Sequence, residues 1–440
     1  MSHTHDRAIS VEALARVEGE GAMHVRVTDG VVERVELEIY EPPRFFEAFL
    51  RGRRMDEPVD ITARICGICP VAYQFSAARA IESLCGVEIP DGIAQLRRLL
   101  YCGEWIESHV LHIFLLHAPD FLGYQGAIEM ASDHRELVET ALRLRKAGNT
   151  LLEVVGGRAI HPINVRIGGF HRAPTRAELD ALVDELSWCR DAAADAARLI
   201  AGFEFPHLEI EPTYVALRPE PGSGPSGATD YPIDAGRIVS TTGLDIPVED
   251  WPEHFHEEQM SHSTALHGRM RDGGVYLVGP AARFNLNADR LPPASAELAA
   301  EVGLVAPVTN PFRSILVRAV ELHYAVDEAL RLIAAYEPPE VPAVPVTPVA
   351  GVGHGATEAP RGILYHRYEL SDDGTITAAT IVPPTSQNQP AIEADLAAFV
   401  QDHLHLDDDD LQWRCEQAIR NYDPCISCST HFLDLTVERR

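Results

Sequence analysis

The chain has 440 residues, 46% of them hydrophobic, which is enough to bury a large core. Its 66 acidic and 37 basic side chains leave a formal net charge of −29, which excludes the broad basic surface that nucleic-acid binding needs. No stretch approaches the roughly 20 apolar residues of a membrane span, and residues 1–7 lack the apolar core of a signal peptide. We therefore expect no membrane span and, by default, a cytoplasmic protein.

The first 40 residues predict β structure. Apolar and polar residues alternate over 22–28 and again over 31–40, on either side of an Asp29–Gly30 turn. This pattern predicts a hairpin within about 8–40. Four apolar residues then recur at helical spacing: Phe45, Phe46, Phe49 and Leu50.

Long helical patterns dominate from residue 71 to about 203, and another follows at 311–336, within a predicted helical core of about 71–336. The clearest cover residues 93–116, 136–155, 176–201 and 311–336. Pro174 is expected in the first turn of the third of these helices, where its missing N–H costs nothing. Residues 204–310 are rich in Pro, Gly and Ser and predict loops and short strands.

The C-terminal part mixes strands and helices. A Pro-rich stretch over 337–348 predicts a stiff, extended connector. After it come predicted strands at 362–370 and 375–382, a helix at 390–403 and a solvated helix entry in the acidic run 407–410. The fold class is therefore α+β and predominantly helical, with a long-helix core at about 71–336, a C-terminal segment at about 350–431 and small peripheral β hairpins.

Eight cysteines divide into two kinds. Cys66 and Cys69 form one Cys-x-x-Cys pair, and Cys425 and Cys428 form another. Two thiolates separated by two residues can point at one ion, so the two pairs predict a four-sulfur metal site. The isolated cysteines lie in apolar or helical surroundings and are expected to be small core residues: Cys85, Cys102, Cys189 and Cys415.

Spacing alone leaves several uses for the four paired cysteines. A redox dithiol is disfavoured because no thioredoxin-like βαβ pattern surrounds either pair. Structural zinc is the commonest use of four cysteines, but zinc ribbons keep their pairs close together. Here more than 350 residues separate the pairs, which weakens the zinc interpretation without selecting another metal.

The two pairs belong to a larger set of motifs that are arranged in order along the chain. They are Arg16-x-Glu18-Gly, Arg64-x-Cys66-Gly-x-Cys69, His117-Ala-Pro-Asp120, Glu358-x-Pro-Arg361-Gly, Pro384-Thr385-x-x-Asn388 and Asp423-Pro-Cys425-x-x-Cys428-x-x-His431. This set resembles the signatures of nickel–iron hydrogenase large subunits. The resemblance covers residues 16–431 and implies the fold of that family, as one catalytic unit over 1–431.

The resemblance also implies the ligands of the metal centre. All four paired cysteines would bind nickel, with Cys66 and Cys425 as terminal ligands. Cys69 and Cys428 would bridge nickel to an iron ion that carries carbon monoxide and cyanide. Thiolates suit these metals because they are soft donors.

Further residues take catalytic roles by the same resemblance. Arg361 would lie beside the metals and donate to a cyanide, while the Thr385 hydroxyl would donate to the other. Asp120 and Asp423 would pair with Arg361, since a buried guanidinium without a carboxylate is costly. Glu18 would carry protons from a nickel cysteine; Glu20, two residues on, would not.

A second metal, magnesium or iron, is implied near the C-terminus. Its predicted ligands are the Glu47 carboxylate, the Ile381 carbonyl and His431; oxygen ligands suit magnesium. In the family, a protease cuts after this histidine once nickel chaperones have delivered the metal. Residues 432–440 are therefore expected to be a propeptide.

The chain departs from the family at Tyr73, where many members have a histidine that hydrogen-bonds near a bridging sulfur. Its motif variants look most like the cytoplasmic NAD(P)-linked hydrogenases and the sulfhydrogenase alpha subunits. The chain has no nucleotide-binding motif and no further cysteines at iron–sulfur spacing. An iron–sulfur small subunit, with flavin/NAD(P) and ferredoxin-like subunits, would therefore take the electrons from H2.

Two other kinds of protein compete with this interpretation. One is a non-catalytic subunit like those of respiratory complex I, which share the fold but lack the four metal cysteines. The other is a zinc-stabilised protein. Cys66, Cys69, Cys425 and Cys428 argue against the first, and the supporting motifs argue against the second.

Overall fold

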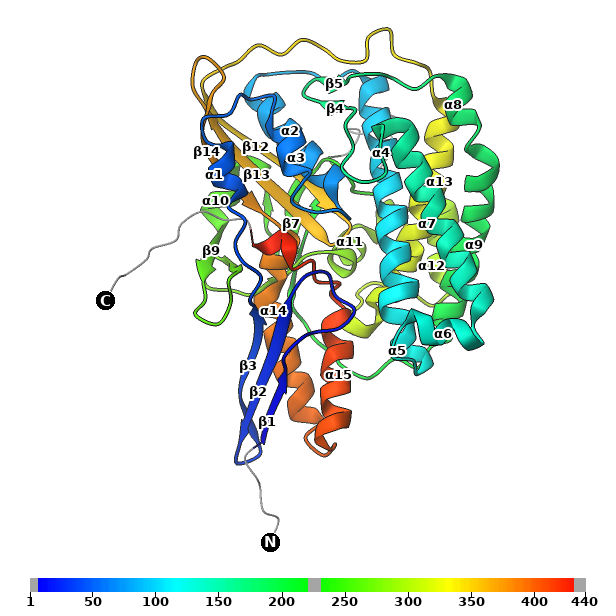
Figure 1. Ribbon diagram of the computed structural model, residues 1–440, viewed down its shortest axis with the longest axis vertical. Helices are drawn as coiled ribbons and strands as arrows, with labels where there is room; N and C mark the ends of the chain where they lie inside the picture. The colour runs from blue at the N-terminus through cyan, green and yellow to red at the C-terminus, as the bar shows by residue number, and fades with distance from the viewer. Residues whose placement is uncertain (1–6, 221–230, 431–440) are drawn as a thin grey trace, which may run out of the picture.

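The computed structural model describes residues 7–220 and 231–430 (Figure 1). Its N-terminal part is an antiparallel sheet of β1 (Arg7–Val11), β2 (Gly21–Thr28) and β3 (Val31–Ile39), in that order. The predicted hairpin is β2–β3, and β1 extends it along β2. The apolar face of this sheet packs in one cluster with residues of the C-terminal helices.

The predicted long helices pack against one another as a bundle at the right of Figure 1. They are α4 (Asp91–Val110), α7 (Arg135–Gly156), α9 (Val183–Ala201) and α13 (Ser314–Ala335), with α13 behind α7 in this view. Gly148 lets α4 and α7 approach closely, because a Cβ there would lie 3.0 Å from the backbone nitrogen of Glu107. These helices and their neighbours enclose the main hydrophobic core.

Two of the long helices differ in detail from the prediction. The predicted helix 176–201 is broken into α8 (Arg176–Asp180) and α9, and Pro174 precedes the N-cap Thr175 instead of lying in the first turn. Thr175 and Glu178 form a capping box, so the hydroxyl, not proline, starts α8. The predicted helix 93–116 ends as a π-helical turn, η1 (Leu111–His117), before Pro119, whose ring disfavours ordinary α-helical hydrogen bonding.

A three-stranded sheet covers α3 (Pro70–Leu84), in the order β12 (Gly351–Ala359), β13 (Gly362–Leu370), β14 (Ile376–Val382). The strands β13 and β14 were predicted, but β12 was not, because its glycines hide the alternation. These glycines allow contact with α3: a Cβ at Gly353 would lie 2.0 Å from the carbonyl oxygen of Ala80.

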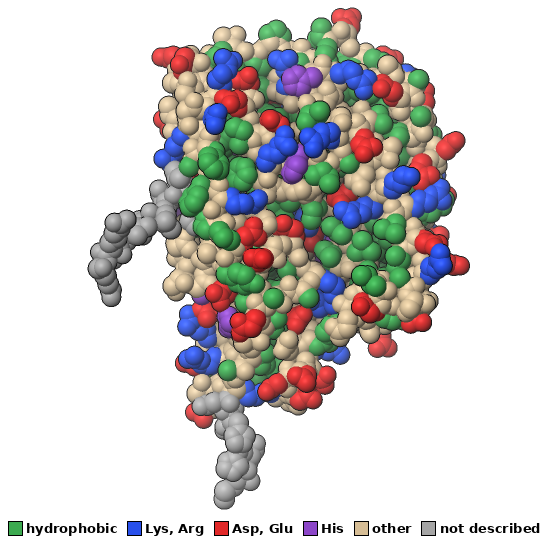
Figure 2. Space-filling view, viewed as in Figure 1, with side chains coloured by type: hydrophobic (Ala, Val, Ile, Leu, Met, Phe, Trp, Pro, Cys, Tyr) green, Lys and Arg blue, Asp and Glu red, His purple; other side chains and the backbone are tan. Residues whose placement is uncertain are grey.

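The helices α14 (Pro384–Asp402) and α15 (Asp408–Arg420) complete the fold beside the N-terminal sheet. The first begins six residues before the predicted start at 390, which brings Thr385 into its first turn. The acidic run is a helix entry as predicted, since the Asp407 carboxylate caps α15 by accepting from the backbone of Asp410. Acidic side chains gather at this end of the molecule in Figure 2.

The remaining elements connect these layers. The short helices are α1 (Phe46–Leu50), α2 (Pro58–Thr62), α5 (Ala118–Leu122), α6 (Ala127–Asp133), α10 (Trp251–His254), α11 (Pro280–Asn287) and α12 (Pro293–Glu301). The short strands are β4 (Val165–Arg166), β5 (Gly169–Phe170), β6 (Thr213–Arg218), β7 (Arg237–Ser240), β8 (Asp245–Ile246), β9 (Phe255–Gln259), β10 (Leu266–Met270) and β11 (Tyr276–Leu277). Within residues 7–220 and 231–430, no helix combines the length and apolar character needed to cross a bilayer.

Candidate metal centre

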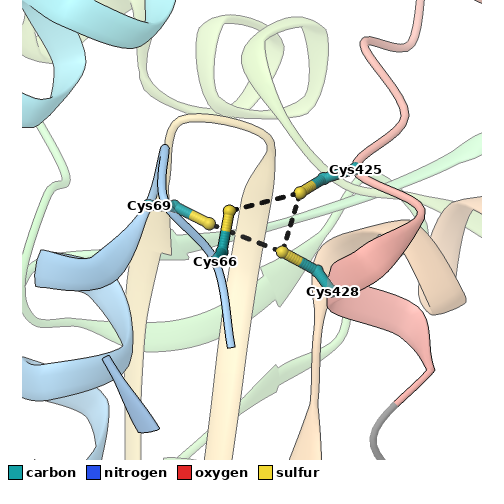
Figure 3. Close-up of side chains that lie close together, drawn as sticks. All are labelled: Cys66, Cys69, Cys425 and Cys428. Carbon is teal, nitrogen blue, oxygen red and sulfur yellow. Dashed lines mark hydrogen bonds between the residues drawn. The ribbon is translucent and has the colours of Figure 1, made fainter. Parts of the chain in front are cut away.

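The four paired cysteines meet at one buried point (Figure 3). Their sulfur atoms lie 3.5 Å apart between Cys66 and Cys425, 3.6 Å apart between Cys69 and Cys428, and 2.8 Å apart between Cys425 and Cys428. All four are free thiols, and none is more than 4% exposed. The predicted four-sulfur cluster is therefore present, while Cys102, Cys189 and Cys415 are buried separately and Cys85 is partly buried.

This donor set fits a soft or borderline metal ion. Burial raises the pKa of the Cys425 and Cys428 thiols, because a buried thiolate has lost its water. Four thiolates in one dry pocket repel one another, and a coordinated cation removes both costs by taking the place of the protons. The residues present therefore fit the nickel–iron centre.

The N-terminal pair is supported by helices close to it in sequence. Cys66 follows α2, and Cys69 is the N-cap residue of α3, with Pro70 in its first turn. The carboxylate of Glu104, on α4, accepts hydrogen bonds from the backbone nitrogens of Val71 (2.6 Å) and Ala72 (3.2 Å). Glu104 thus satisfies the free N–H groups of the helix start and holds Cys69 in place.

The C-terminal pair depends on distant parts of the chain. Glu18 and Cys425 pair as an isolated parallel bridge, in which the backbone nitrogen of Ile426 donates to the Glu18 carbonyl at 2.9 Å. Thr385, at the start of α14, accepts from the backbone nitrogen of Cys425 at 2.9 Å. The Thr385 hydroxyl hydrogen therefore remains available for a second partner.

Glu18 contacts the metal centre with its side chain as well. Its Oε2 atom accepts from the Cys425 thiol at 3.1 Å and from the backbone nitrogen of Ser427 at 3.1 Å. Burial raises the pKa of Glu18, and the sulfur of Cys66 raises it further. A carboxyl with a raised pKa beside a sulfur atom is suited to accept and release a proton. Glu20, in contrast, is exposed.

Arg361 pairs with Asp423, as predicted. Its Nη2 atom lies 3.0 Å from the Asp423 carboxylate, and its Nε donates to the Asp423 carbonyl at 2.7 Å. Burial opposes the charge on Arg361, but Asp423 and the cysteine sulfurs raise its pKa above the usual value. The buried Nη1 has no hydrogen-bond partner among the described residues. This unpaired N–H group of Arg361 could donate a hydrogen bond to an acceptor atom carried by the metal centre.

The predicted pairing of Asp120 with Arg361 is wrong. The Asp120 carboxylate pairs instead with Arg420, at 2.7 and 2.8 Å, and with Arg16. The reason is the packing of α5 against the end of α15, which places Arg420 beside Asp120. Asp120 therefore anchors the segment just before Asp423 and does not contact the guanidinium of Arg361.

Two of the three predicted magnesium ligands lie side by side. The Glu47 carboxylate, from α1, accepts from the backbone nitrogen of Ile381, in β14, at 2.7 Å. The third, His431, lies outside the described residues, as does the predicted propeptide 432–440. The magnesium site remains a prediction.

Tyr73, at the position of the usual family histidine, is buried on α3. Burial raises the pKa of its hydroxyl, and the charges of Cys428 and Cys69 raise it further, so the side chain lies close to both of these cysteines. Its ring lies 5.7 Å from that of His366.

The sequence motifs did not include Glu104. An acidic residue in the otherwise apolar stretch of α4 is nevertheless a signal in the sequence that could have pointed to this buried carboxylate.

This arrangement defines a class of protein: an oxidoreductase subunit whose metal centre is bound by four thiolates, with an arginine and a proton-accepting carboxylate beside it. A family model described as nickel-dependent hydrogenase matches residues 44–155 and 322–431. The chain belongs to the nickel-dependent hydrogenase family and is its large, catalytic subunit. Neither a zinc-stabilised protein nor a non-catalytic subunit is favoured.

Several relatives match almost the whole chain. Sulfhydrogenase 1 subunit alpha of Pyrococcus furiosus is 33% identical, over 97% of this chain and 98% of its own length. The beta subunit of the NAD-reducing hydrogenase HoxS of Cupriavidus necator is 28% identical, over 97% and 95%. A crystal structure of an NAD+-reducing [NiFe]-hydrogenase in the H2-reduced state is similar with a TM-score of 0.86 and 27% identity, covering 97% of this chain and 99% of that one.

Proposed function

We propose that this subunit oxidises H2 reversibly to protons and electrons, and that the electrons leave through an iron–sulfur small subunit to a flavin/NAD(P) module. The relatives named for NAD reduction and the sulfhydrogenase alpha subunit support this assignment, because they align along the whole chain. No nucleotide-binding motif occurs in the sequence. The electron acceptors therefore belong to other subunits, including a ferredoxin-like one. We place the complex in the cytoplasm.

Nickel and iron, when bound, supply the site at which H2 is split heterolytically. Cys66 and Cys425 would hold nickel alone, and Cys69 and Cys428 would hold both metals. The free Nη1 of Arg361 and the hydroxyl of Thr385 are the donors suited to cyanide on the iron. Arg361 itself is fixed by Asp423, so its position needs no rearrangement during the reaction.

The observation that carries the mechanism is the contact between the Cys425 sulfur and Glu18, at 3.1 Å. The Cys425 sulfur touches a carboxylate, so Cys425 would pass the proton from H2 cleavage to Glu18. Glu18 would accept this proton on Oε2. Burial raises the pKa of Glu18, which favours its protonated form and suits it to take up a proton.

We assign the second metal, magnesium or iron, to Glu47, the Ile381 carbonyl and His431. Glu47 and Ile381 are adjacent, which supports a shared ligand role. Cleavage after His431 by a maturation protease, following delivery of nickel by chaperones, would remove residues 432–440. Maturation would thus leave His431 at the end of the chain.

The test is purification of the complex from cells that express the chain with an N-terminal tag. We expect iron–sulfur and flavin subunits to copurify, NAD+ or NADP+ to be reduced under H2, and the large subunit to end at His431 by intact mass. Nickel should be present at roughly one per chain, as a single thiolate-bound centre requires. Zinc without nickel, or active enzyme that reduces dyes but neither nucleotide, would overturn the respective part of the assignment.

A further inference from the structure

We propose that His262, His267 and Glu393 bind a divalent transition-metal ion, preferably Zn²⁺, at a site separate from the four cysteines. His262 lies in the turn between β9 and β10, His267 on β10, and Glu393 on α14. One ligand atom from each lies within 4.8 Å of the others. None of the three is a predicted ligand of the nickel–iron or magnesium sites.

His267 is the residue that most needs an ion. Its side chain is 0% exposed, and neither ring nitrogen makes a hydrogen bond of good geometry among residues 7–220 and 231–430, although the Gln389 amide lies close enough to interact with it. Burying an imidazole without a partner costs free energy, and buried polar groups in proteins are nearly always satisfied. A metal ion bound to one ring nitrogen would satisfy His267, because the amide of Gln389 can serve at most one of the two nitrogens.

The neighbouring groups supply the charge that a cation requires. His262 Nε2 lies 2.7 Å from the Glu393 carboxylate, and its Nδ1 lies 3.4 Å from the carboxylate of Glu36, on β3. Arg34 pairs with Glu36 and offsets part of that charge. Burial lowers the pKa of His267 to about 4, so its ring is neutral at neutral pH and free to coordinate.

The donor types select the kind of ion. Two imidazoles and one carboxylate suit Zn²⁺ and similar transition-metal ions, whereas Mg²⁺ prefers oxygen ligands throughout. Ligand atoms around a tetrahedral zinc lie roughly 3.3 Å apart, given metal–nitrogen distances of about 2.0 Å. The side chains of His262 and Glu393 are 12% and 16% exposed, so solvent reaches one edge of the site.

An ion here would join the β9–β10 hairpin to α14 and, through Glu393, to β3. His262 and His267 belong to the β9–β10 hairpin, and Glu393 to α14. Glu393 also accepts from the backbone nitrogen of Leu37, in β3, at 2.9 Å. Figure 1 shows α14 and β3 side by side, and α14 also carries Thr385, which holds the backbone of Cys425. The ion would therefore have a structural role in the scaffold behind the C-terminal cysteine pair.

The competing account needs no ion. In it the His262 ring bridges Glu393 and Glu36, and His267 has only the Gln389 amide beside it. The two accounts predict different zinc contents, and they assign different roles to His267.

The experiment uses the matured complex, treated with EDTA, passed through a desalting column and titrated with Zn²⁺ in the presence of excess Mg²⁺. We expect a zinc site in the parent, and an anomalous difference peak at the zinc edge between His262, His267 and Glu393 in crystals of the complex. His267→Gln should weaken zinc binding about 100-fold or more and leave nickel and iron unchanged. His256→Gln, on the neighbouring strand β9, is the matched control and should bind zinc like the parent.

Two results would overturn the proposal: no zinc peak at these residues in the parent, or unchanged zinc affinity in His267→Gln. If His267→Gln fails to fold, the crystal of the parent still decides the matter. A zinc peak at the cysteines alone, with nickel absent, would instead contradict the assignment of the nickel–iron centre, so the two failures can be told apart.

Discussion

The two cysteine pairs reach one site from supports of opposite kinds. Cys66 and Cys69 lie between two helices, and the backbone after Cys69 is held by Glu104 from the next helix along the chain. Cys425 lies just before, and Cys428 within, the 3-10 turn η5 (Ser427–Ser429), and this segment is held by Glu18 and Thr385, which are far away in sequence. One pair is positioned by local structure, and the other by the completed fold.

This difference assigns separate tasks to the two halves. Local helices form without long loop closure, so the N-terminal pair is in place early. We expect the C-terminal segment to be ordered later, because its partners come from the N-terminal part of the chain and from α14. A segment that is placed last is also the one suited to be withheld until metal has been delivered.

The largest effect is expected from Cys425→Ser. A serine hydroxyl does not ionise near neutral pH and is a poor ligand for soft metals, so hydrogen uptake should be abolished. Because cleavage after His431 is expected to wait for nickel, intact mass should show the uncut chain. Cys415→Ser, at a buried lone cysteine on α15, is the control and should keep both uptake and cleavage. Normal uptake in Cys425→Ser would refute the ligand assignment.

Glu18→Gln tests the contact between the distant support and the C-terminal pair. The amide still accepts from Ser427 but cannot take a proton, so isotope exchange between H2 and water should slow by about 10²–10⁴-fold. Nickel and iron contents, measured by mass spectrometry, should not change. Glu20→Gln alters an exposed carboxyl two residues away and should exchange at the rate of the parent. Equal rates in both variants would remove Glu18 from the proton path.

Glu104→Ala tests the support of the N-terminal pair. The substitution leaves the backbone nitrogens of Val71 and Ala72 without their acceptor, and each such buried group costs about 1–3 kcal/mol. We expect a lower Tm by calorimetry and a lower yield of metal-loaded protein. Glu104→Gln keeps one acceptor and most of the packing, so it should recover much of the loss. A Tm in Glu104→Ala equal to that of the parent would show that α3 does not depend on this carboxyl.

Much of the metal centre could be predicted because its ligands occur in motifs with fixed spacing. The sequence placed Glu18, Arg361 and Thr385 correctly beside the cysteines for the same reason. Spacing cannot show which arginine a carboxylate will choose, however. Asp120 pairs with Arg420 and Arg16 because α5 packs on α15, and this contact exists only in the tertiary structure.

The same limit explains what the sequence missed. The strand β12 packs its glycines on α3, so the alternation that marks a strand is absent from its side chains. His262, His267 and Glu393 come together from a hairpin and a helix more than 120 residues apart, without any recognisable spacing. Such groups become visible only when the chain is folded.

The smallest effect concerns Asp395, on α14, which accepts a hydrogen bond from Tyr422, the residue before Asp423. Burial raises the pKa of Asp395 from 3.8 to about 6. Protonation of Asp395 therefore stabilises the folded state. Its contribution to the free energy of unfolding is at most about 3 kcal/mol; it is complete below pH 4 and is lost as the pH rises through 6. The amide in Asp395→Asn does not titrate, so the Tm of this variant relative to that of the parent should rise as the pH increases from 4.5 to 7. The exposed Asp402→Asn, at the end of α14, should follow the parent, and parallel Tm curves for all three would show that Asp395 does not couple the C-terminal segment to pH.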